Sequence, residues 1–210
     1  MDQASQLPGT KRTRARSQTI AGIGLFAALA IVLNFTHIQV PAPYAQFLIY
    51  EFWEIPTVVC LLIFGLFAAL TASLINTIVL LLVNPGATSF GPIYNFIAVA
   101  VSLVAIVLAN KLCTEANFAF SAQVLIATGL AIVVRSAVMT VVNYALLPFP
   151  PPLGIPIPEK VVVPLLPLIA FFNATLVLYT VPIGYTAARA ATSRVHFALA
   201  YPLQRMNAKN

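Results

Sequence analysis

Apolar residues in this chain gather into six long blocks that polar or proline-rich stretches separate. The blocks cover residues 19–36, 46–64, 66–83, 92–112, 122–147 and 161–187. Each is close to the ~20 apolar residues that a helix needs to cross the hydrocarbon core of a bilayer. The pattern therefore predicts an all-α integral membrane bundle of six transmembrane helices.

The breaks between the blocks predict the connections. Only Gly65 separates the second block from the third, which predicts a helical hairpin with a very tight turn or one broken helix pair. Proline removes backbone donors and disfavours helix, so the segments VNPGATSFGP and LPFPPPLGIPIPE are predicted to be loops. The chain then divides into a basic tail at 1–18, a six-helix membrane domain at 19–187 and a second basic tail at 188–210.

Positive charges near the ends of the blocks predict the orientation. If the N-terminus is cytoplasmic, the outer side carries only Lys160. The inner side then carries Lys11, Arg12, Arg14, Arg16, Lys111, Arg189, Arg194, Arg205 and Lys209. Such an excess of lysine and arginine marks the cytoplasmic side of membrane proteins. Because an even number of spans returns the chain to the side where it began, both termini are predicted to be cytoplasmic and the proline-rich loop extracellular.

The composition agrees with a membrane protein and narrows the possible functions. Hydrophobic residues make up 60% of the chain and charged residues 8%, whereas soluble domains carry about 25% charged residues. The net charge of +6 lies beside the predicted spans, where topology and anionic lipid account for it, so nucleic-acid binding is not indicated. Cys60 and Cys113 lack the spacing of a disulfide framework or a metal site and are interpreted as packed thiols.

Three charged residues, Glu51, Glu54 and Arg135, fall within the predicted spans in addition to Lys111 at the inner end of the fourth. A charge at membrane depth costs several kcal/mol unless it is paired, protonated or faces a polar cavity, so such residues usually belong to a functional site or lock a bundle together. Glu51 and Glu54 are three residues apart and would share one face of a helix. Arg135 lies near the middle of its block, at a height similar to that of Glu51, so these two residues are predicted to lie within pairing distance.

Three roles stay open for this predicted pair. It is a structural ion pair that neutralises both charges, a pair with one partner facing a ligand, or a proton relay. If the pairing is correct, replacing Arg135 alone destabilises the fold more than replacing Arg135 and Glu51 together.

Asparagines and aromatic residues form a second group of candidate functional residues, many of them near the predicted outer ends of the helices. Asn95 and Asn143 are expected at the outer mouth, where a carboxamide can donate to and accept from a ligand. Asn76 and Asn173 are expected to form hydrogen bonds between helices. Aromatic residues around the same mouth are Tyr44, Phe47, Tyr50, Phe52, Trp53, Phe90, Tyr94, Phe96 and Tyr144. An interfacial belt explains at least half of them, and the others suit a pocket for a planar, mostly neutral organic solute.

The sextet GLFAAL occurs twice, at residues 24–29 and 65–70. Each copy begins with a glycine and has an alanine four residues later, near the predicted cytoplasmic end of a span. Small residues let helices approach closely, so the pairs Gly24 with Ala28 and Gly65 with Ala69 form a docking face for another membrane helix or pack the bundle internally. Coincidence is a third explanation in a chain so rich in alanine, leucine and phenylalanine.

Motifs of common enzymes are missing from the sequence. It contains no G-x-x-x-x-G-K-[ST] loop, no G-x-S-x-G and no H-E-x-x-H, so any ATP hydrolysis would have to come from a partner. The histidines are His37, near the first loop, and His196, in the basic tail. An intramembrane enzyme stays open as an alternative, because a carboxylate without a known motif can still carry out chemistry.

The order of several short motifs resembles the substrate-binding S components of energy-coupling factor (ECF) vitamin transporters, particularly the riboflavin type. The motifs are a small-residue-rich first span, F-L-x-Y-E-F-x-E-I-P at 47–56, L-x-F-G ending at Gly65, G-P-I-Y-N-F at 91–96 and N-Y-A-L-L-P at 143–148. The resemblance covers roughly residues 21–185, and the family also has six spans with both ends cytoplasmic. The chain departs from the family at Glu51, where aspartate is usual, and at Gly24, where alanine is usual. Arg135 has no counterpart in the family pattern.

The resemblance implies a solute-binding subunit of the cell membrane that captures a vitamin, with riboflavin favoured, from outside. It implies association with a shared ECF membrane subunit and two ATPases, and neither catalysis nor a cofactor or metal in this chain. Tyr50, Asn95 and Asn143 are the implied ligand contacts, with Glu51, Glu54 and Arg135 shaping the site. The implied docking face consists of Gly24, Ala28, Gly65 and Ala69.

A lid is expected in the loop before Tyr44 or around Pro85. Two further alternatives stay open beside the enzyme: an S component for a different vitamin or small organic solute, and a purely structural bundle subunit.

Overall fold

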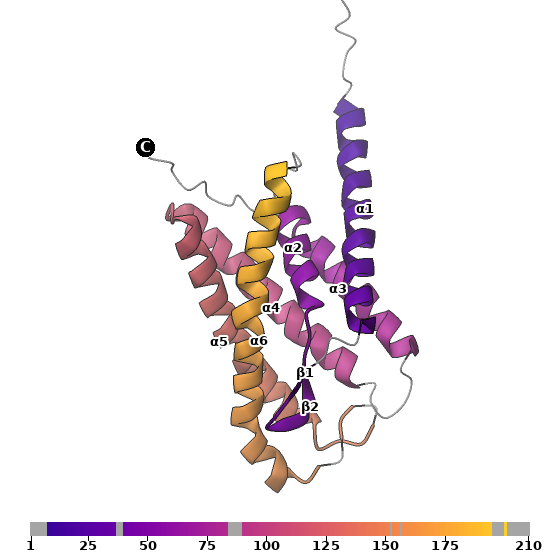
Figure 1. Ribbon diagram of the computed structural model, residues 1–210, viewed down its shortest axis with the longest axis vertical. Helices are drawn as coiled ribbons and strands as arrows, with labels where there is room; N and C mark the ends of the chain where they lie inside the picture. The colour runs from indigo at the N-terminus through magenta and orange to yellow at the C-terminus, as the bar shows by residue number, and fades with distance from the viewer. Residues whose placement is uncertain are drawn as a thin grey trace, which may run out of the picture.

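The computed structural model describes residues 8–36, 40–83, 90–151, 153–155, 157–194 and 200. These residues form six helices and one β hairpin: α1 (Pro8–Phe35), β1 (Val40–Ala42), β2 (Ala45–Tyr50), α2 (Glu54–Phe64), α3 (Leu66–Val83), α4 (Phe90–Glu115), α5 (Phe120–Leu146) and α6 (Glu159–Arg194). The first residues of α1 and the last residues of α6 lie at the same end of the bundle, and the hairpin lies toward the other end (Figure 1).

Five of these helices are long and apolar enough to cross a membrane. The membrane-capable stretches are Ser17–Phe35, Leu66–Val83, Gly91–Glu115, Phe120–Leu146 and Glu159–Ser193. This confirms the prediction of a mainly helical, multi-pass membrane bundle. Helix α1 begins at Pro8, so the basic stretch that was expected to be a tail is helical and continuous with the first span.

The second predicted span, residues 46–64, is wrong over its first eight residues, because helix α2 begins only at Glu54. Strand β2 runs antiparallel to β1, with Val40 opposite Tyr50 and Pro41 opposite Ile49. Helix α2 has only 11 residues, which corresponds to about 16 Å and is about half of the hydrocarbon thickness. Apart from Glu51, Glu54 and Thr57, the run from Phe47 to Phe64 is mainly apolar, and an apolar run without clear periodicity does not distinguish a strand from a buried helix.

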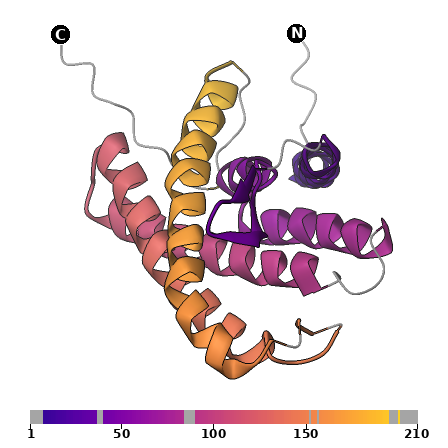
Figure 2. The same ribbon diagram turned by 60° about the horizontal axis from the view of Figure 1, so that its bottom comes forward.

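Helix α2 is short because it lies inside the protein. It packs against α1, α3 and α6, and nine of its residues are buried: Glu54, Pro56, Thr57, Val58, Val59, Cys60, Leu61, Leu62 and Ile63. Helices α4 and α6 flank α5, whereas α1 packs mainly on α2 and α3. Figure 2 accordingly shows α1 at the edge of the bundle, with α3 and α4 side by side.

The tight turn predicted between the second and third blocks is confirmed. Gly65 alone separates α2 from α3, with a φ of 92° that residues bearing a Cβ rarely adopt. Its N–H still donates to the carbonyl oxygen of Leu61, at 2.9 Å. Glycine therefore lets the chain leave one helix and start the next without an intervening loop.

Several sequence-based predictions concern parts that lie outside the described residues. They are the lid around Pro85, the roles of His37 and His196, and the side chains of Phe47 and Phe90. The lid expected before Tyr44 is described only from Val40 onward, where the chain forms β1.

Candidate solute-binding cavity

A cavity of about 150 Å³ lies between the β hairpin and helices α4, α5 and α6. Its lining mixes apolar, aromatic, amide and charged side chains, as is typical of binding sites for small molecules. The lining residues are Leu48, Ile49, Glu51, Gly91, Tyr94, Asn95, Ala98, Arg135, Met139, Asn143, Leu147, Ile169, Phe172 and Asn173. Four of the six residues predicted for the site, Glu51, Asn95, Arg135 and Asn143, therefore lie at one cavity, and Tyr50 and Glu54 do not line it.

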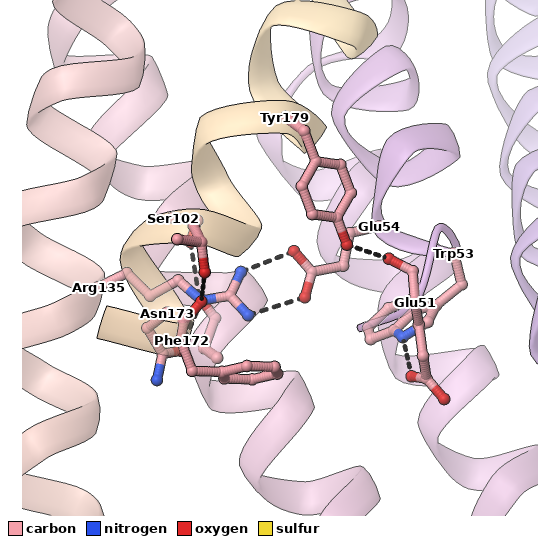
Figure 3. A network of polar contacts seen from close by, with 10 residues as sticks. Glu51, Trp53, Glu54, Ser102, Arg135, Phe172, Asn173 and Tyr179 are labelled. Atoms are coloured by element: carbon pink, nitrogen blue, oxygen red, sulfur yellow. Dashed lines mark hydrogen bonds and ion pairs between the residues drawn. The ribbon is translucent and has the colours of Figure 1, made fainter. Parts of the chain in front are cut away.

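A buried ion pair forms part of this site. The guanidinium of Arg135 donates to both carboxylate oxygens of Glu54, with Nη1 to Oε2 at 2.6 Å and Nη2 to Oε1 at 2.8 Å (Figure 3). Its Nε donates to Oδ1 of Asn173 at 2.9 Å. The Arg135 side chain is 1% exposed and that of Glu54 6%. Each charge thus neutralises the other, and the contacts connect α5 to α2 and α6.

The prediction that Glu51 pairs with Arg135 is wrong. Residues 51–53 are not helical, so Glu51 and Glu54 do not share a helix face, and the partner of Arg135 is Glu54. Glu51 instead accepts a hydrogen bond from Nε1 of Trp53 at 2.8 Å. Its main-chain oxygen accepts one from the hydroxyl of Tyr179 at 2.7 Å. The error arose because the end of strand β2 was extrapolated as helix.

The amide residues are arranged partly as the sequence predicts. Nδ2 of Asn34 donates to Oδ1 of Asn76 at 2.8 Å, which confirms that Asn76 connects helices, here α1 and α3. Asn173 likewise connects α6 to Arg135 of α5, and it also lines the cavity, which the sequence did not predict. Asn143 donates from Nδ2 to the carbonyl of Met139, at 2.7 Å, so its amide plane is held by its own helix.

Tyr50 attaches the β hairpin to α6. Its hydroxyl hydrogen-bonds to the hydroxyl of Tyr44 at 2.7 Å and to Oγ1 of Thr175 at 2.8 Å. Its ring packs on that of Phe172, with centroids 4.8 Å apart. Desolvation by burial, together with the hydrogen bond to Tyr50, raises the pKa of the Tyr44 phenol. These contacts hold the hairpin at the cavity, where the neighbouring residues Leu48 and Ile49 contribute to the lining.

The loop between α5 and α6 is attached to the same region. The hydroxyl of Tyr94, a residue of the cavity lining, donates to the main-chain oxygen of Leu153 at 2.8 Å. The next residue, Gly154, lies so close to the main-chain oxygens of Leu146 and Leu147 that a Cβ would overlap them. Glycine therefore allows this loop to pack directly on the end of α5, beside the cavity.

Sequence reasoning missed several lining residues on α5 and α6. Met139, Ile169 and Phe172 belong to long apolar runs in which nothing distinguishes a cavity-facing residue from a lipid-facing one. One signal was available in the spacing. Met139 lies four residues from both Arg135 and Asn143, so a helix places all three on one face.

The small residues predicted to dock a partner have different environments. Gly24 and Ala28 are both exposed on α1, and a Cβ at Gly24 would meet nothing within 4 Å. Gly65 is half-buried in its turn. Ala69 is fully buried, so the docking prediction does not hold for this residue, which packs inside the bundle.

The fold and its cavity define a multi-pass membrane protein with a mixed polar and apolar cavity. No family model and no curated protein matches the sequence. Among solved structures, the chain superposes on the S component of a bacterial ECF transporter with a TM-score of 0.67, over 86% of this chain and 98% of that one. The two sequences are 19% identical. At 19% identity the similarity establishes the fold alone. As far as the fold is concerned, it confirms the resemblance seen in the sequence motifs.

Proposed function

We propose that this protein is the substrate-binding subunit of an ECF-type importer of the cell membrane, and that it captures a vitamin from outside the cell. The observation that carries the proposal is the cavity itself. Within an S-component fold it brings together three amides, an ion-paired arginine and two aromatic residues, Tyr94 and Phe172. Polar groups on several helices that converge on one hollow are costly in a membrane bundle, and binding a polar solute explains them.

Riboflavin is the first candidate for the solute. The motifs at 47–56, 91–96 and 143–148 support it, because they resemble the riboflavin type most closely. In this proposal Asn95 and Asn143 contact the vitamin, and Tyr50 acts indirectly by holding the hairpin against α6. Glu51 and the pair of Arg135 with Glu54 shape the polar side of the site. The proposal assigns no catalysis to this chain, and partner ATPases supply the energy.

Purified protein in detergent tests the proposal by titration with riboflavin. We expect quenching of flavin fluorescence, and a yellow preparation if the vitamin stays bound through purification. Asn95→Leu and Asn143→Leu are expected to raise the Kd at least about tenfold, because each removes a hydrogen-bonding group from the cavity. Asn34→Leu is the matched control, since it removes a buried amide between α1 and α3 that does not line the cavity.

The outcomes separate the solute from the function. Stabilisation by another vitamin, without any response to flavins, would replace riboflavin and leave the binding function intact. A protein that binds no vitamin of a broad panel, although it is folded, contradicts the proposal and favours a structural subunit.

Association with the coupling membrane subunit is proposed to involve the exposed small residues of α1. Leucine at Gly24 or Ala28 is expected to abolish co-purification of ATPase activity from the native membrane, because a bulky side chain prevents close helix contact. Solute binding should be unchanged. Gly129→Leu is the control, since Gly129 is an exposed small residue on α5 with nothing within 4 Å of its Cβ position. If both α1 variants retain the ATPases, Gly24 and Ala28 are not part of the docking face, and this proposal is wrong.

A further inference from the structure

The guanidinium of Arg135 has hydrogen-bonding capacity that the ion pair does not use. An arginine side chain carries five N–H donors in one plane. Among the described residues, Arg135 uses one each from Nη1 and Nη2 on Glu54 and the Nε donor on Asn173. Two N–H donors, one on each terminal nitrogen, are therefore left over on a side chain that lines the cavity.

These two donors are fixed in position. Three hydrogen bonds from α2 and α6 hold the guanidinium plane, and the side chain is only 1% exposed. A donor that is buried without an acceptor is costly, because it has lost its hydrogen bonds to water. An acceptor inside the cavity removes this cost, so the site favours a ligand that brings an oxygen or nitrogen lone pair to Arg135.

The charges around the cavity restrict what kind of acceptor this is. Glu54 already neutralises Arg135, and the carboxylate of Glu51 lies at the same cavity. A ligand carboxylate or phosphate would therefore meet an ion pair with no positive charge to spare. A neutral carbonyl accepts from Arg135 without this repulsion.

The amide side chains of the cavity also favour a neutral ligand with polar atoms along the edge of a ring. Asn95 and Asn143 line the cavity on α4 and α5, where they can hydrogen-bond to the polar edge of a ring. Tyr94 and Phe172 line it as well and provide apolar surface for the ring faces.

We infer that Arg135 is the specificity-determining residue of the cavity, and that the ligand class is a neutral heterocycle with a carbonyl that accepts from one of its two remaining N–H donors. Glu54 and Asn173 are positioning residues that hold the guanidinium plane. This inference rests on the proposed function, because it assumes that the cavity binds a solute.

A ligand panel tests the class without any mutation. Thermal stabilisation of the purified full-length protein is measured with neutral ring compounds that carry carbonyls, namely riboflavin, lumichrome and nicotinamide. The anionic compounds nicotinate and biotin and the cationic compound thiamine form the comparison set. We expect the tightest binder to be a neutral carbonyl compound. Nicotinamide and nicotinate are matched in shape, so the amide should bind more tightly than the acid wherever either of them binds.

Arg135→Lys tests the residue. Lysine keeps the positive charge beside Glu54 but lacks the planar set of donors, so the Kd for the tightest binder of the panel is expected to rise about 10- to 100-fold. Arg189→Lys is the matched control. Arg189 lies over the ring of Phe120, 4.5 Å from its centroid, and is not part of the cavity lining. Its replacement should leave the Kd unchanged.

The results that would overturn the inference differ from those that would overturn the proposed function. If an anion or thiamine is the tightest binder, or if Arg135→Lys binds as the wild type does, the binding function stands and the role of Arg135 is refuted. If the wild type binds nothing in the panel, both proposals fail. Should Arg135→Lys not fold, the ligand panel on the wild-type protein still decides the ligand class.

Discussion

Replacing Arg135 with alanine is expected to lower the free energy of unfolding by about 3–5 kcal/mol, because it leaves the carboxylate of Glu54 buried without its partner. The Glu54 side chain is 6% exposed and receives two hydrogen bonds from the guanidinium. Without them it must stay charged in an apolar site or take up a proton, and both are costly. The change should appear as a lower thermal midpoint of the purified protein in detergent.

A double-mutant cycle identifies the partner of Arg135. Adding Glu54→Ala to Arg135→Ala should recover part of the lost stability, because the orphaned carboxylate is removed with the arginine. The corresponding double variant with Glu51→Ala should show no such recovery, since Glu51 is bonded to Trp53. Recovery with Glu51 and not with Glu54 would contradict the ion pair described above.

Gly184→Ala is expected to destabilise the protein by about 1–3 kcal/mol through overpacking. Helix α6 crosses α2 here so closely that a Cβ at Gly184 would lie 2.5 Å from Cγ1 and 2.7 Å from Cβ of Val58. Val58 is 4% exposed, and its branched side chain has few rotamers with which to move aside. The two helices must therefore separate, which loosens the packing around α2.

Two further variants make this prediction specific. Gly129→Ala on α5 is the matched control. Its Cβ meets nothing within 4 Å, so the better helix propensity of alanine should leave the thermal midpoint unchanged or slightly higher. Combining Gly184→Ala with Val58→Ala should recover only a small part of the loss, because alanine removes Cγ1 of Val58 but keeps the Cβ at 2.7 Å. If Gly184→Ala is as harmless as Gly129→Ala, the close approach of α6 and α2 is incorrect.

The β hairpin was beyond the reach of sequence reasoning. Residues 47–64 are mostly apolar despite Glu51 and Glu54, long enough for a span and interrupted by few turn residues, so composition favours one membrane helix. The chain forms a strand at Ala45–Tyr50 instead, because β1 supplies backbone hydrogen bonds and Thr175 of α6 binds the hydroxyl of Tyr50. Strand β1 comes from a segment that the sequence pattern left outside the predicted spans, and Thr175 is 125 residues away from Tyr50 in the chain. Local periodicity reveals neither contact.

The sequence identified several residues of the candidate site but not the contacts between them. The cost of polar groups in a membrane singled out Glu51, Glu54 and Arg135 before any contact was known. Which glutamate meets Arg135 depended on where helix α2 begins, and element boundaries are the least predictable part of a fold. Asn173 was expected to connect helices and does so, but its place in the cavity lining depends on how α6 packs against α5.

The sequence by itself determined that this protein lives in a membrane, where five of its spans lie and which rare polar residues need an explanation. These properties follow from transfer free energies, which depend on residue type and on the length of an apolar run. Only the tertiary structure decided that the second helix is short and buried, that Arg135 pairs with Glu54, and that the cavity lies under the hairpin. Those features depend on contacts between residues far apart in the chain, such as Arg135 with Glu54 and Tyr50 with Thr175, and on the packing that brings them together.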